Sequence, residues 1–208
     1  MKIFKFQFFL IIFFSLNIVS CKKILLMHYQ IKDPKVENAE SIQKFFDKKD
    51  LSDKKTFVLT PEGYKQTIRK IGFPGIQIFD HKGKYISYSD DESCTGNVGE
   101  FFGTLQKSPE FNVSFPDSDT LRLNHVLKEL RNLDGEAVVI DEFDEMQSDF
   151  VVIIYWAKFV GRLNSRDSKS WLEGIDKNTD STFETIWVNS DLQDWWDEAD
   201  LKQFGFSQ

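Results

Sequence analysis

The sequence predicts a layered α/β fold in which helices flank a mixed sheet. Segments rich in β-branched and aromatic residues alternate along the chain with segments whose apolar residues recur at helical spacing. Residues 76–88 have the pattern of a hairpin, with two β-rich runs joined by a short turn that contains Gly83. Residues 150–156 are an almost continuous apolar run, as expected for a central strand that is covered on both faces.

The residues before the hairpin predict two strands and two helices. Asn38 and Thr60 are suited to begin the helices, because their side-chain oxygens can accept a hydrogen bond from the first turn. Tyr64, Ile68 and Ile71 give the second helix one apolar stripe. In order, we expect a buried strand over 23–29, a loop over 31–37, a helix over 38–47, a strand over 56–59 and a helix over 60–72.

The residues after the hairpin predict a second series of alternating elements. Pro109 and Pro116 lie in a stretch without apolar periodicity, which indicates a linker. Trp195, Trp196 and Leu201 are expected to supply the apolar side of a final helix. In order, we expect a helix that opens at 90–93 and has its buried stripe over 98–105, a linker over 106–117, a helix from 119 or 120 to 134, strands over 137–140 and 150–156, a helix over 164–175, a strand over 182–188 and a polar helix over 191–204.

The first 20 residues have the character of a secretory signal. Lys2 and Lys5 begin an apolar stretch, 6–19, whose length suits a signal peptide and is short for a membrane-spanning helix. The sequence Ile-Val-Ser-Cys at 18–21 resembles the lipobox of bacterial lipoproteins. That resemblance implies diacylglycerol on the Cys21 thiol, cleavage before Cys21 and acylation of the new amino terminus. The alternatives are an ordinary signal followed by a chance cysteine, and a helix that stays uncleaved.

The resemblance to lipoproteins also implies a location. It places the chain in the bacterial cell envelope, with the membrane as a partner through the N-terminal lipid. In some lipoproteins an Asp directly after the acylated cysteine marks retention in the inner membrane. Lys22 and Lys23 follow Cys21 here. We therefore expect an outer-membrane anchor and a domain that faces the periplasm.

Composition and charge exclude several classes of function. The formal charge is −7, and removal of residues 1–20, which carry two lysines and no acid, would make it two units more negative. An acidic chain without basic clusters is a poor nucleic-acid binder, so no nucleic-acid partner is expected. The histidines His28, His81 and His125 show no ligand spacing, so we expect neither a metal nor a cofactor.

One stretch resembles the thioredoxin fold around its cis-proline. It reads Ile-Gly-Phe-Pro-Gly-Ile-Gln-Ile-Phe-Asp at 71–80, followed by Lys-Gly-Lys at 82–84. The resemblance implies that Pro74 follows a cis peptide bond, and cis bonds are almost confined to X-Pro. The alternative is an ordinary trans proline before an edge strand.

A second stretch, 151–164, resembles the first core strand and the active-site turn of thioredoxin. There a strand runs into Trp-Ala, an aromatic residue and then a Cys-Gly-Pro-Cys motif. Trp156 and Phe159 match the two aromatic positions, whereas Val160 and Leu163 occupy those of the two cysteines. Dithiol exchange needs an attacking thiolate and a second thiol, so the resemblance implies the scaffold without the redox chemistry.

Two domain arrangements are compatible with these resemblances. Either an incomplete second thioredoxin-like half packs beside a complete domain, or residues 73–88 supply its missing hairpin in a permuted single domain. The need of 150–155 for cover on both faces favours two packed pieces. The segment 155–164 is also similar to lipoproteins of the Bacteroidetes type. The predicted ranges are a leader over 1–20, a thioredoxin-like domain over 21–108, a linker over 109–117 and the incomplete half over 118–208.

A scaffold that lacks its cysteines favours binding over electron transfer. We therefore predict a non-catalytic, membrane-anchored interaction lipoprotein. Its expected groove holds an extended peptide or a partner protein. The candidate groove residues are Phe73, Pro74, Trp156, Phe159 and Val160.

The alternative function is a one-thiol redox protein that uses Cys94. This cysteine precedes a predicted helix, where the helix dipole lowers a thiol pKa, but Asp90, Asp91 and Glu92 stand close and raise it. A structural role for Cys94 is the other interpretation, and a purely structural envelope protein is a third possibility for the chain. The acidic run at 141–145 lacks the ligand order of an EF-hand, and we expect a solvated loop there.

Overall fold

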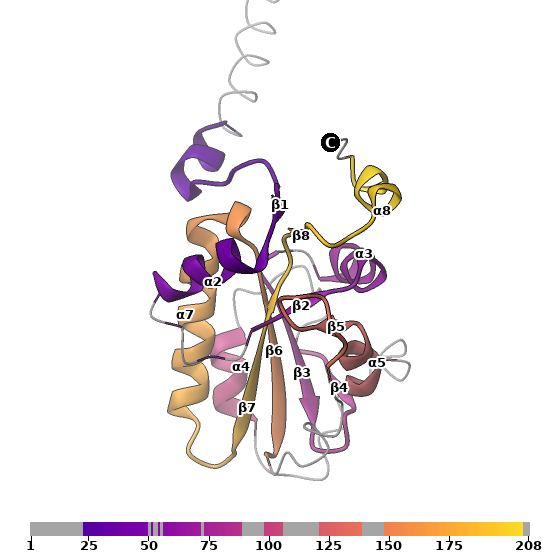
Figure 1. The fold of residues 1–208 in the computed structure, drawn as a ribbon. Coiled ribbons are helices and arrows are strands. Elements are labelled where there is room, and N and C mark those ends of the chain that lie inside the picture. Colours follow the sequence, from indigo (N-terminus) through magenta and orange to yellow (C-terminus); the bar gives the residue numbers. More distant parts are fainter. Residues whose placement is uncertain are drawn as a thin grey trace, which may run out of the picture.

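The computed structural model describes residues 23–49, 51, 54, 56–71, 73–88, 98–105, 121–138 and 148–205. Within these residues the chain forms a mixed sheet of six strands in the order β4-β3-β6-β7-β2-β5, and a separate pair β1-β8 (Figure 1). The strands are β1 Val36–Glu37, β2 Thr56–Leu59, β3 Gly75–Asp80, β4 Tyr85–Ile86, β5 Leu130–Arg131, β6 Phe150–Trp156, β7 Phe183–Asn189 and β8 Leu192–Gln193. The helices are α2 Ala39–Asp47, α3 Pro61–Lys70, α4 Val98–Thr104, α5 Leu123–Lys128, the 3-10 helix η2 Lys158–Val160, α7 Arg162–Lys177 and α8 Glu198–Gln203.

Strand β6 is the centre of the sheet. It pairs in parallel with β7 and antiparallel with β3, and each of its residues is buried. The predicted central strand is thus confirmed, because a strand with neighbours on both edges and helices on both faces has no polar side to present.

The hairpin predicted around Gly83 is also confirmed. β3 and β4 pair antiparallel, and the turn is closed by hydrogen bonds from the Lys82 and Lys84 amides to Asp80 Oδ1. Gly83 has φ of 70°, which a glycine adopts readily. The Phe73–Pro74 peptide bond is cis, as the resemblance in this stretch implies.

Strands from both predicted domain ranges belong to one sheet and are intermixed in it. β3 belongs to the range 21–108 and β6 to the range 118–208, yet they pair continuously from Gly75–Tyr155 to Asp80–Phe150. On the other side of β7, β2 from the first range and β5 from the second complete the sheet. Both predicted ranges therefore contribute strands to one sheet, in which the 73–88 hairpin lies beside strand 150–156.

Helices cover both faces of the sheet and enclose two hydrophobic clusters. One face is covered by α2, α4 and α7, and the other by α3, α5 and α8 (Figure 1). Successive side chains of β6 enter the two clusters alternately, since side chains of a strand point to opposite faces. Val151, Ile153 and Tyr155 pack on the α3 side, whereas Val152, Ile154 and Trp156 pack on the α7 side.

The predicted caps of the first two helices are confirmed. The Asn38 side chain accepts from the Ser41 amide and Ser41 Oγ accepts from the Asn38 amide, which forms a capping box. Thr60 Oγ1 accepts from the Gly63 amide at 3.0 Å. The predicted stripe of α3 is wrong at Ile68, which is 39% exposed. Tyr64 and Thr67 occupy the buried side instead.

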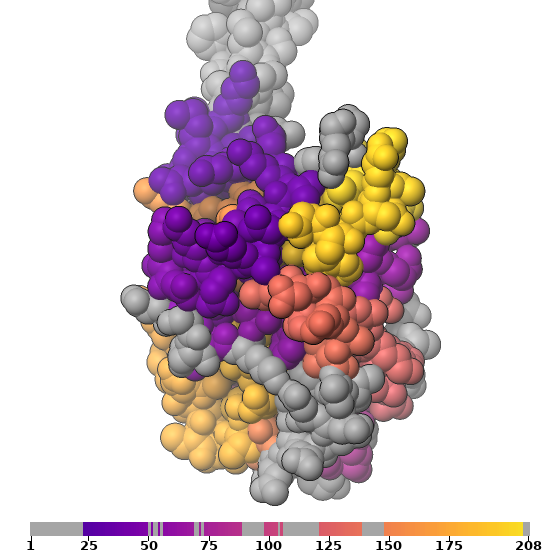
Figure 2. Space-filling model, in the orientation of Figure 1, coloured from indigo at the N-terminus to yellow at the C-terminus, as the bar shows by residue number. Residues whose placement is uncertain are grey.

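The prediction of a buried strand over 23–29 is wrong, because these residues form a helix on the surface. A short apolar run does not distinguish a strand from a helix, and here no sheet edge receives it. The predicted loop over 31–37 ends in β1, which pairs in parallel with β8. Figure 2 shows the resulting contact between N-terminal residues, in indigo and purple, and C-terminal residues, in yellow.

Two predicted helices in the second half are shorter than expected. α5 ends at Lys128, because Leu130 and Arg131 pair with β2 as strand β5. The helix predicted over 191–204 is replaced at its start by β8, and α8 begins only after Asp197, whose side chain accepts from the Asp200 amide. In both places the backbone N–H and C=O groups pair with a neighbouring strand, so they are not available for the hydrogen bonds of a helix.

Helices α4 and α7 approach each other closely at two glycines. A Cβ on Gly174 would meet the carbonyl oxygen of Gly99, and a Cβ on Gly99 would lie 2.8 Å from the carbonyl oxygen of Ser170. This contact fixes one side of α7. Among the residues described, no helix is both long enough and apolar enough to cross a membrane.

Candidate functional site

The five residues of the predicted groove do not line one continuous surface. Phe73 and Phe159 contact each other edge to face, with ring centroids 6.0 Å apart. Pro74 and Val160 are buried. Trp156 packs in the cluster on the α7 side of the sheet, whereas Phe73 packs against the cluster on the α3 side.

The turn that resembles a redox turn is covered by the chain itself. The Lys32 amide donates to the Phe159 carbonyl at 2.9 Å. Gly161, with φ of 64°, lies against the carbonyl oxygens of Tyr29 and Gln30, which leave no room for a Cβ. The segment just after the 23–29 helix thus occupies the space above this turn.

The positions that resemble a cysteine pair hold apolar side chains. Val160 is 3% exposed, and Leu163 is half-buried in the first turn of α7. Neither can attack a disulfide. Cys21 and Cys94, as well as the acidic run at 141–145, lie outside the described residues, so the predictions made for them stay predictions.

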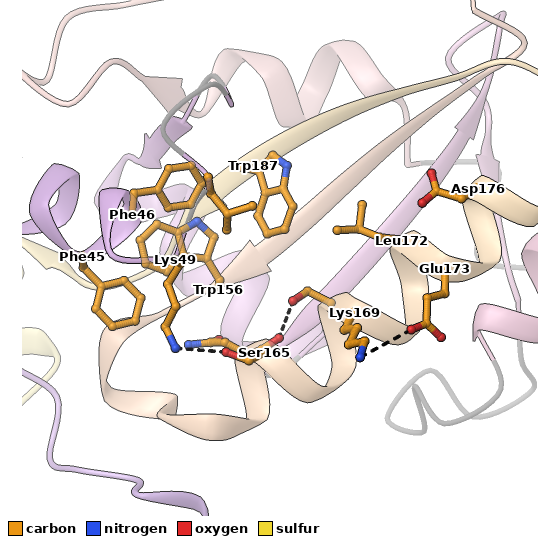
Figure 3. A pocket seen from close by; sticks show the side chains of 13 residues that line it. Phe45, Phe46, Lys49, Trp156, Ser165, Lys169, Leu172, Glu173, Asp176 and Trp187 are labelled. Carbon is orange, nitrogen blue, oxygen red and sulfur yellow. Dashed lines mark hydrogen bonds and ion pairs between the residues drawn. The ribbon is translucent and has the colours of Figure 1, made fainter.

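A pocket of about 360 Å³ opens between α2 and α7 (Figure 3). Its size is in the range of pockets that hold small ligands or a few side chains of a peptide. Aromatic and aliphatic side chains form its floor, and charged and hydroxyl side chains form its rim. We call it the α2–α7 pocket; its lining residues are Phe45, Phe46, Lys49, Leu51, Trp156, Asn164, Ser165, Ser168, Lys169, Leu172, Glu173, Asp176 and Trp187.

Strand register brings the floor of the α2–α7 pocket together. In the parallel pair β6–β7, Ile154 lies opposite Trp187, so Trp187 and Trp156 lie on the same face at neighbouring positions. The Trp156 ring stacks on Phe45 and Phe46, with centroids 5.4 Å and 4.9 Å apart. Phe46 also meets Trp187 edge to face at 5.8 Å. The floor is therefore a rigid aromatic surface supplied by α2 and two central strands.

Charged side chains of both signs line the rim. Lys49 Nζ donates to Ser165 Oγ at 3.2 Å, which links the end of α2 to the start of α7. Lys169 Nζ lies 3.7 Å from Glu173 Oε1, with the lysine side chain 77% exposed. Along α7 the rim runs from Ser165 through Lys169 to Glu173 and Asp176 (Figure 3). Lys49 thus lies at the α2 end of the rim and Asp176 at the opposite end, with the Lys169–Glu173 pair between them.

A buried polar network lies where β6 and β7 end. Asp191 Oδ2 accepts from the Lys158 amide at 2.8 Å and from Asn189 Nδ2 at 2.7 Å. Burial raises the pKa of the Asp191 carboxyl to about 6, although these two donors favour its ionised form. The nearby Lys158 ammonium pairs with Glu37 Oε2 at 2.5 Å. Burial, helped by the Asp191 charge, raises the pKa of Tyr64 to about 12.

The bonds around this network hold the chain segments at the end of the sheet together. Gln193 Nε2 donates to the Asp191 carbonyl, and the Asp194 amide donates to the Glu37 carbonyl. These bonds attach β8 to β1 and to the end of the sheet. In the part of the chain that is described, no group of three or more His, Cys, Asp or Glu side chains is arranged to hold a metal ion.

Sequence reasoning singled out Trp156 and missed the residues that make it part of a pocket. Phe45 and Phe46 lie within the helix predicted over 38–47, and Trp187 within the strand predicted over 182–188. The missing information was the register that places Trp187 beside Trp156, because it joins segments about 30 residues apart along the chain.

Comparisons with protein-family models, with curated proteins and with solved structures gave no match.

Proposed function

We propose that this protein is a membrane-anchored, non-catalytic binding lipoprotein of the bacterial cell envelope, which holds a peptide segment of a partner protein in the α2–α7 pocket. The observation that carries the proposal is that pocket itself. It combines an aromatic floor with a rim that carries Lys49 at the α2 end, Glu173 and Asp176 at the other end, and Lys169 paired with Glu173 between them.

The arrangement of the sheet supports a thioredoxin-like scaffold in permuted order. A parallel unit β6–α7–β7 lies beside the antiparallel hairpin β3–β4, which precedes it in the chain. In this proposal the hairpin fills the place that would follow β7 in an unpermuted chain. The scaffold is used for binding, because apolar Val160 and Leu163 replace both thiols at the turn.

The covered turn directs the ligand away from the usual redox face. Tyr29, Gln30 and Lys32 already lie over Phe159 and Gly161. A peptide that approached there would have to displace main-chain contacts. The α2–α7 pocket lies on the face of the sheet that α2 and α7 cover, and it is open to solvent.

The lining chemistry specifies the kind of peptide. Trp156 and Trp187 suit a large aromatic or aliphatic side chain, since aromatic floors give large buried area and defined packing. Lys49 and Lys169 favour an acidic residue on one side of that anchor, and Glu173 and Asp176 favour a basic residue on the other. The expected motif is therefore a large apolar residue between an acid and a base.

A displayed random-peptide library, selected on the purified full-length protein, tests this proposal. Peptides with the expected motif should be enriched, and their affinity should fall at least tenfold in a Ser165→Trp variant, whose indole fills the pocket mouth. Ser165 is exposed, so this change is expected to leave the fold intact. Lys177→Trp places the same indole on an exposed part of α7 that does not line the pocket, and is the matched control.

Charge reversal tests the direction in which the peptide lies. Lys169→Glu should weaken the binding of peptides that carry the acidic residue and leave unchanged the binding of peptides with a basic residue in its place. Lys177→Glu should change the affinity for neither kind of peptide. Selection of no peptide, or equal binding by Ser165→Trp and Lys177→Trp, would contradict the proposal.

A further inference from the structure

The helix over 23–29 presents apolar side chains to solvent. Ile24, Leu25 and Met27 are 61%, 56% and 78% exposed. In the described part of the chain, Ile68 at 39% is the other large apolar side chain classed as exposed. Three such residues on one short helix form a patch, and patches of this kind mark contact surfaces more often than scattered apolar residues do. We call it the N-terminal apolar patch.

Specific contacts hold the end of this helix on the folded domain. Arg166 Nη1 donates to the Tyr29 hydroxyl at 3.0 Å, and the guanidinium lies 5.2 Å from the centre of the Tyr29 ring. The Lys32 amide donates to the Phe159 carbonyl. The N-terminal apolar patch is thus attached at a defined place, beside the ends of β6 and β7 (Figure 1).

We propose that the N-terminal apolar patch lies in the lipid bilayer interface and fixes the orientation of the domain on the membrane. The inference rests on the proposed lipid on Cys21, only two residues before Lys23. A chain anchored there has too little length to carry residues 24–27 away from the headgroups. Interfacial helices bury their apolar side at a depth of roughly 5–10 Å, and the exposed Lys23 adds attraction to anionic lipids.

Because the N-terminal apolar patch is held on the folded domain, its contact with the membrane also fixes which end of the domain faces the membrane. Because Tyr29 and Lys32 are bonded to α7 and to η2, the end of the sheet at which β6 and β7 finish faces the membrane. The far end of α7, at Lys177, points away from it (Figure 1). The two ends of α7 should therefore report opposite environments.

Fluorescence quenching in vesicles tests the inference on the full-length protein. The protein is purified from membranes and reconstituted in phosphatidylethanolamine–phosphatidylglycerol vesicles that contain a nitroxide-labelled lipid. A Cys94→Ser background carries one fluorophore, either at Met27→Cys or at Lys177→Cys. We expect strong loss of fluorescence for the label at 27 and none for the label at 177.

A charged variant tests whether the apolar side chains cause the contact. Leu25→Glu with Met27→Glu, labelled at Ile24→Cys, should lose the quenching that Ile24→Cys alone shows. These positions are exposed, so the fold is expected to persist, and circular dichroism checks it. Equal quenching with and without the two glutamates would overturn the inference.

Mass spectrometry of the same preparation separates this inference from the anchor on which it rests. Acylated Cys21 with an unquenched label at 27 overturns the inference and leaves the anchor. Unmodified Cys21 overturns the anchor, and quenching at 27 then supports the interfacial contact by itself, whereas no quenching overturns both. A label at 27 that is shielded without nitroxide quenching assigns the patch to a second copy of the chain and overturns the bilayer contact.

Discussion

The two faces of the sheet are closed to different degrees. On the α2–α7 side the structure leaves an opening of about 360 Å³ over Trp156 and Trp187, whereas on the α3–α5 side the opening beside Tyr155 and Gln77 is about 40 Å³. The first can receive a side chain of a ligand, and the second has room for no more than a few water molecules. The same central strand β6 therefore lines a wide opening on one face and a narrow one on the other.

Polar side chains are buried on the α3–α5 side of the sheet, which we call the closed face; the α2–α7 side is the open face. Tyr155 donates to Gln77 Oε1 at 2.6 Å, and Thr67 donates to the Gly63 carbonyl at 2.8 Å. Buried polar groups need partners; here the first bond joins β6 to β3 within the sheet, and the second lies within α3. On the open face the cluster is aromatic and aliphatic, and α7 is positioned by its backbone contact with α4 at Gly174.

The largest expected effect concerns the polar network at the end of the closed face. Burial raises the pKa of Asp191 from 3.8 to about 6. An acid whose pKa is higher in the folded state binds its proton more tightly there, so its contribution to stability is present below about pH 4 and is lost as the pH rises through about 6. A shift of about two units corresponds to roughly 3 kcal/mol.

Asp191→Asn removes this titration while keeping an acceptor oxygen for Lys158 and Asn189. The stability of the variant relative to the wild type should therefore increase by roughly 3 kcal/mol between about pH 4 and about pH 7. Urea denaturation of both proteins across this range measures the difference. A constant difference would show that Asp191 does not titrate in this window and that the closed face tolerates its charge.

The second prediction concerns the contact that positions α7 on the open face. A methyl group at Gly174 would collide with the backbone of Gly99, which cannot rotate away. Gly174→Ala should cost about 2 to 3 kcal/mol, as overpacked cores do, and should move α7 enough to alter the α2–α7 pocket.

Gly103 provides the matched control on the neighbouring helix. A Cβ there meets nothing within 4 Å, so Gly103→Ala should stabilise the protein by about 0.5 to 1 kcal/mol through helix propensity. Thermal denaturation compares the two alanines. If both changes stabilise, the two helices do not meet as closely as described, and the origin of the pocket needs another account.

Local signals predicted several elements correctly. The caps at Asn38 and Thr60, the hairpin around Gly83 and the buried strand 150–156 depend on neighbours within a few residues, so their sequence patterns determine them. Resemblance, rather than pattern, indicated the cis bond at Pro74.

Features that join distant segments could not be predicted in the same way. The helix over 23–29 and the strand β8 depend on which edges and surfaces the rest of the fold offers. The pairing of β3 with β6 joins strands of the two predicted domain ranges, and the sequence left open whether these strands lie side by side. The α2–α7 pocket needs α2, β6, β7 and α7 together. The sequence identified Trp156 as a candidate but grouped it with Phe73, which packs on the opposite face, and with Phe159, which contacts Phe73.

The smallest expected effect tests how the closed face is held. Burial raises the pKa of Tyr155 well above its ordinary value, so its hydroxyl remains a donor to Gln77 at any ordinary pH. Tyr155→Phe keeps the ring and leaves Gln77 Oε1 buried without this donor, at a cost of about 1 to 2 kcal/mol.

Gln77→Leu in the Tyr155→Phe background removes the unpaired amide as well. Replacing both partners by apolar groups is nearly neutral when the shape is kept, so the double variant should recover most of the loss. Urea denaturation of the wild type, Tyr155→Phe, Gln77→Leu and the double variant gives the coupling energy between the two side chains. An additive result would mean that the pair contributes no more than apolar packing, and the closed face would then differ from the open one only in how tightly its helices fit.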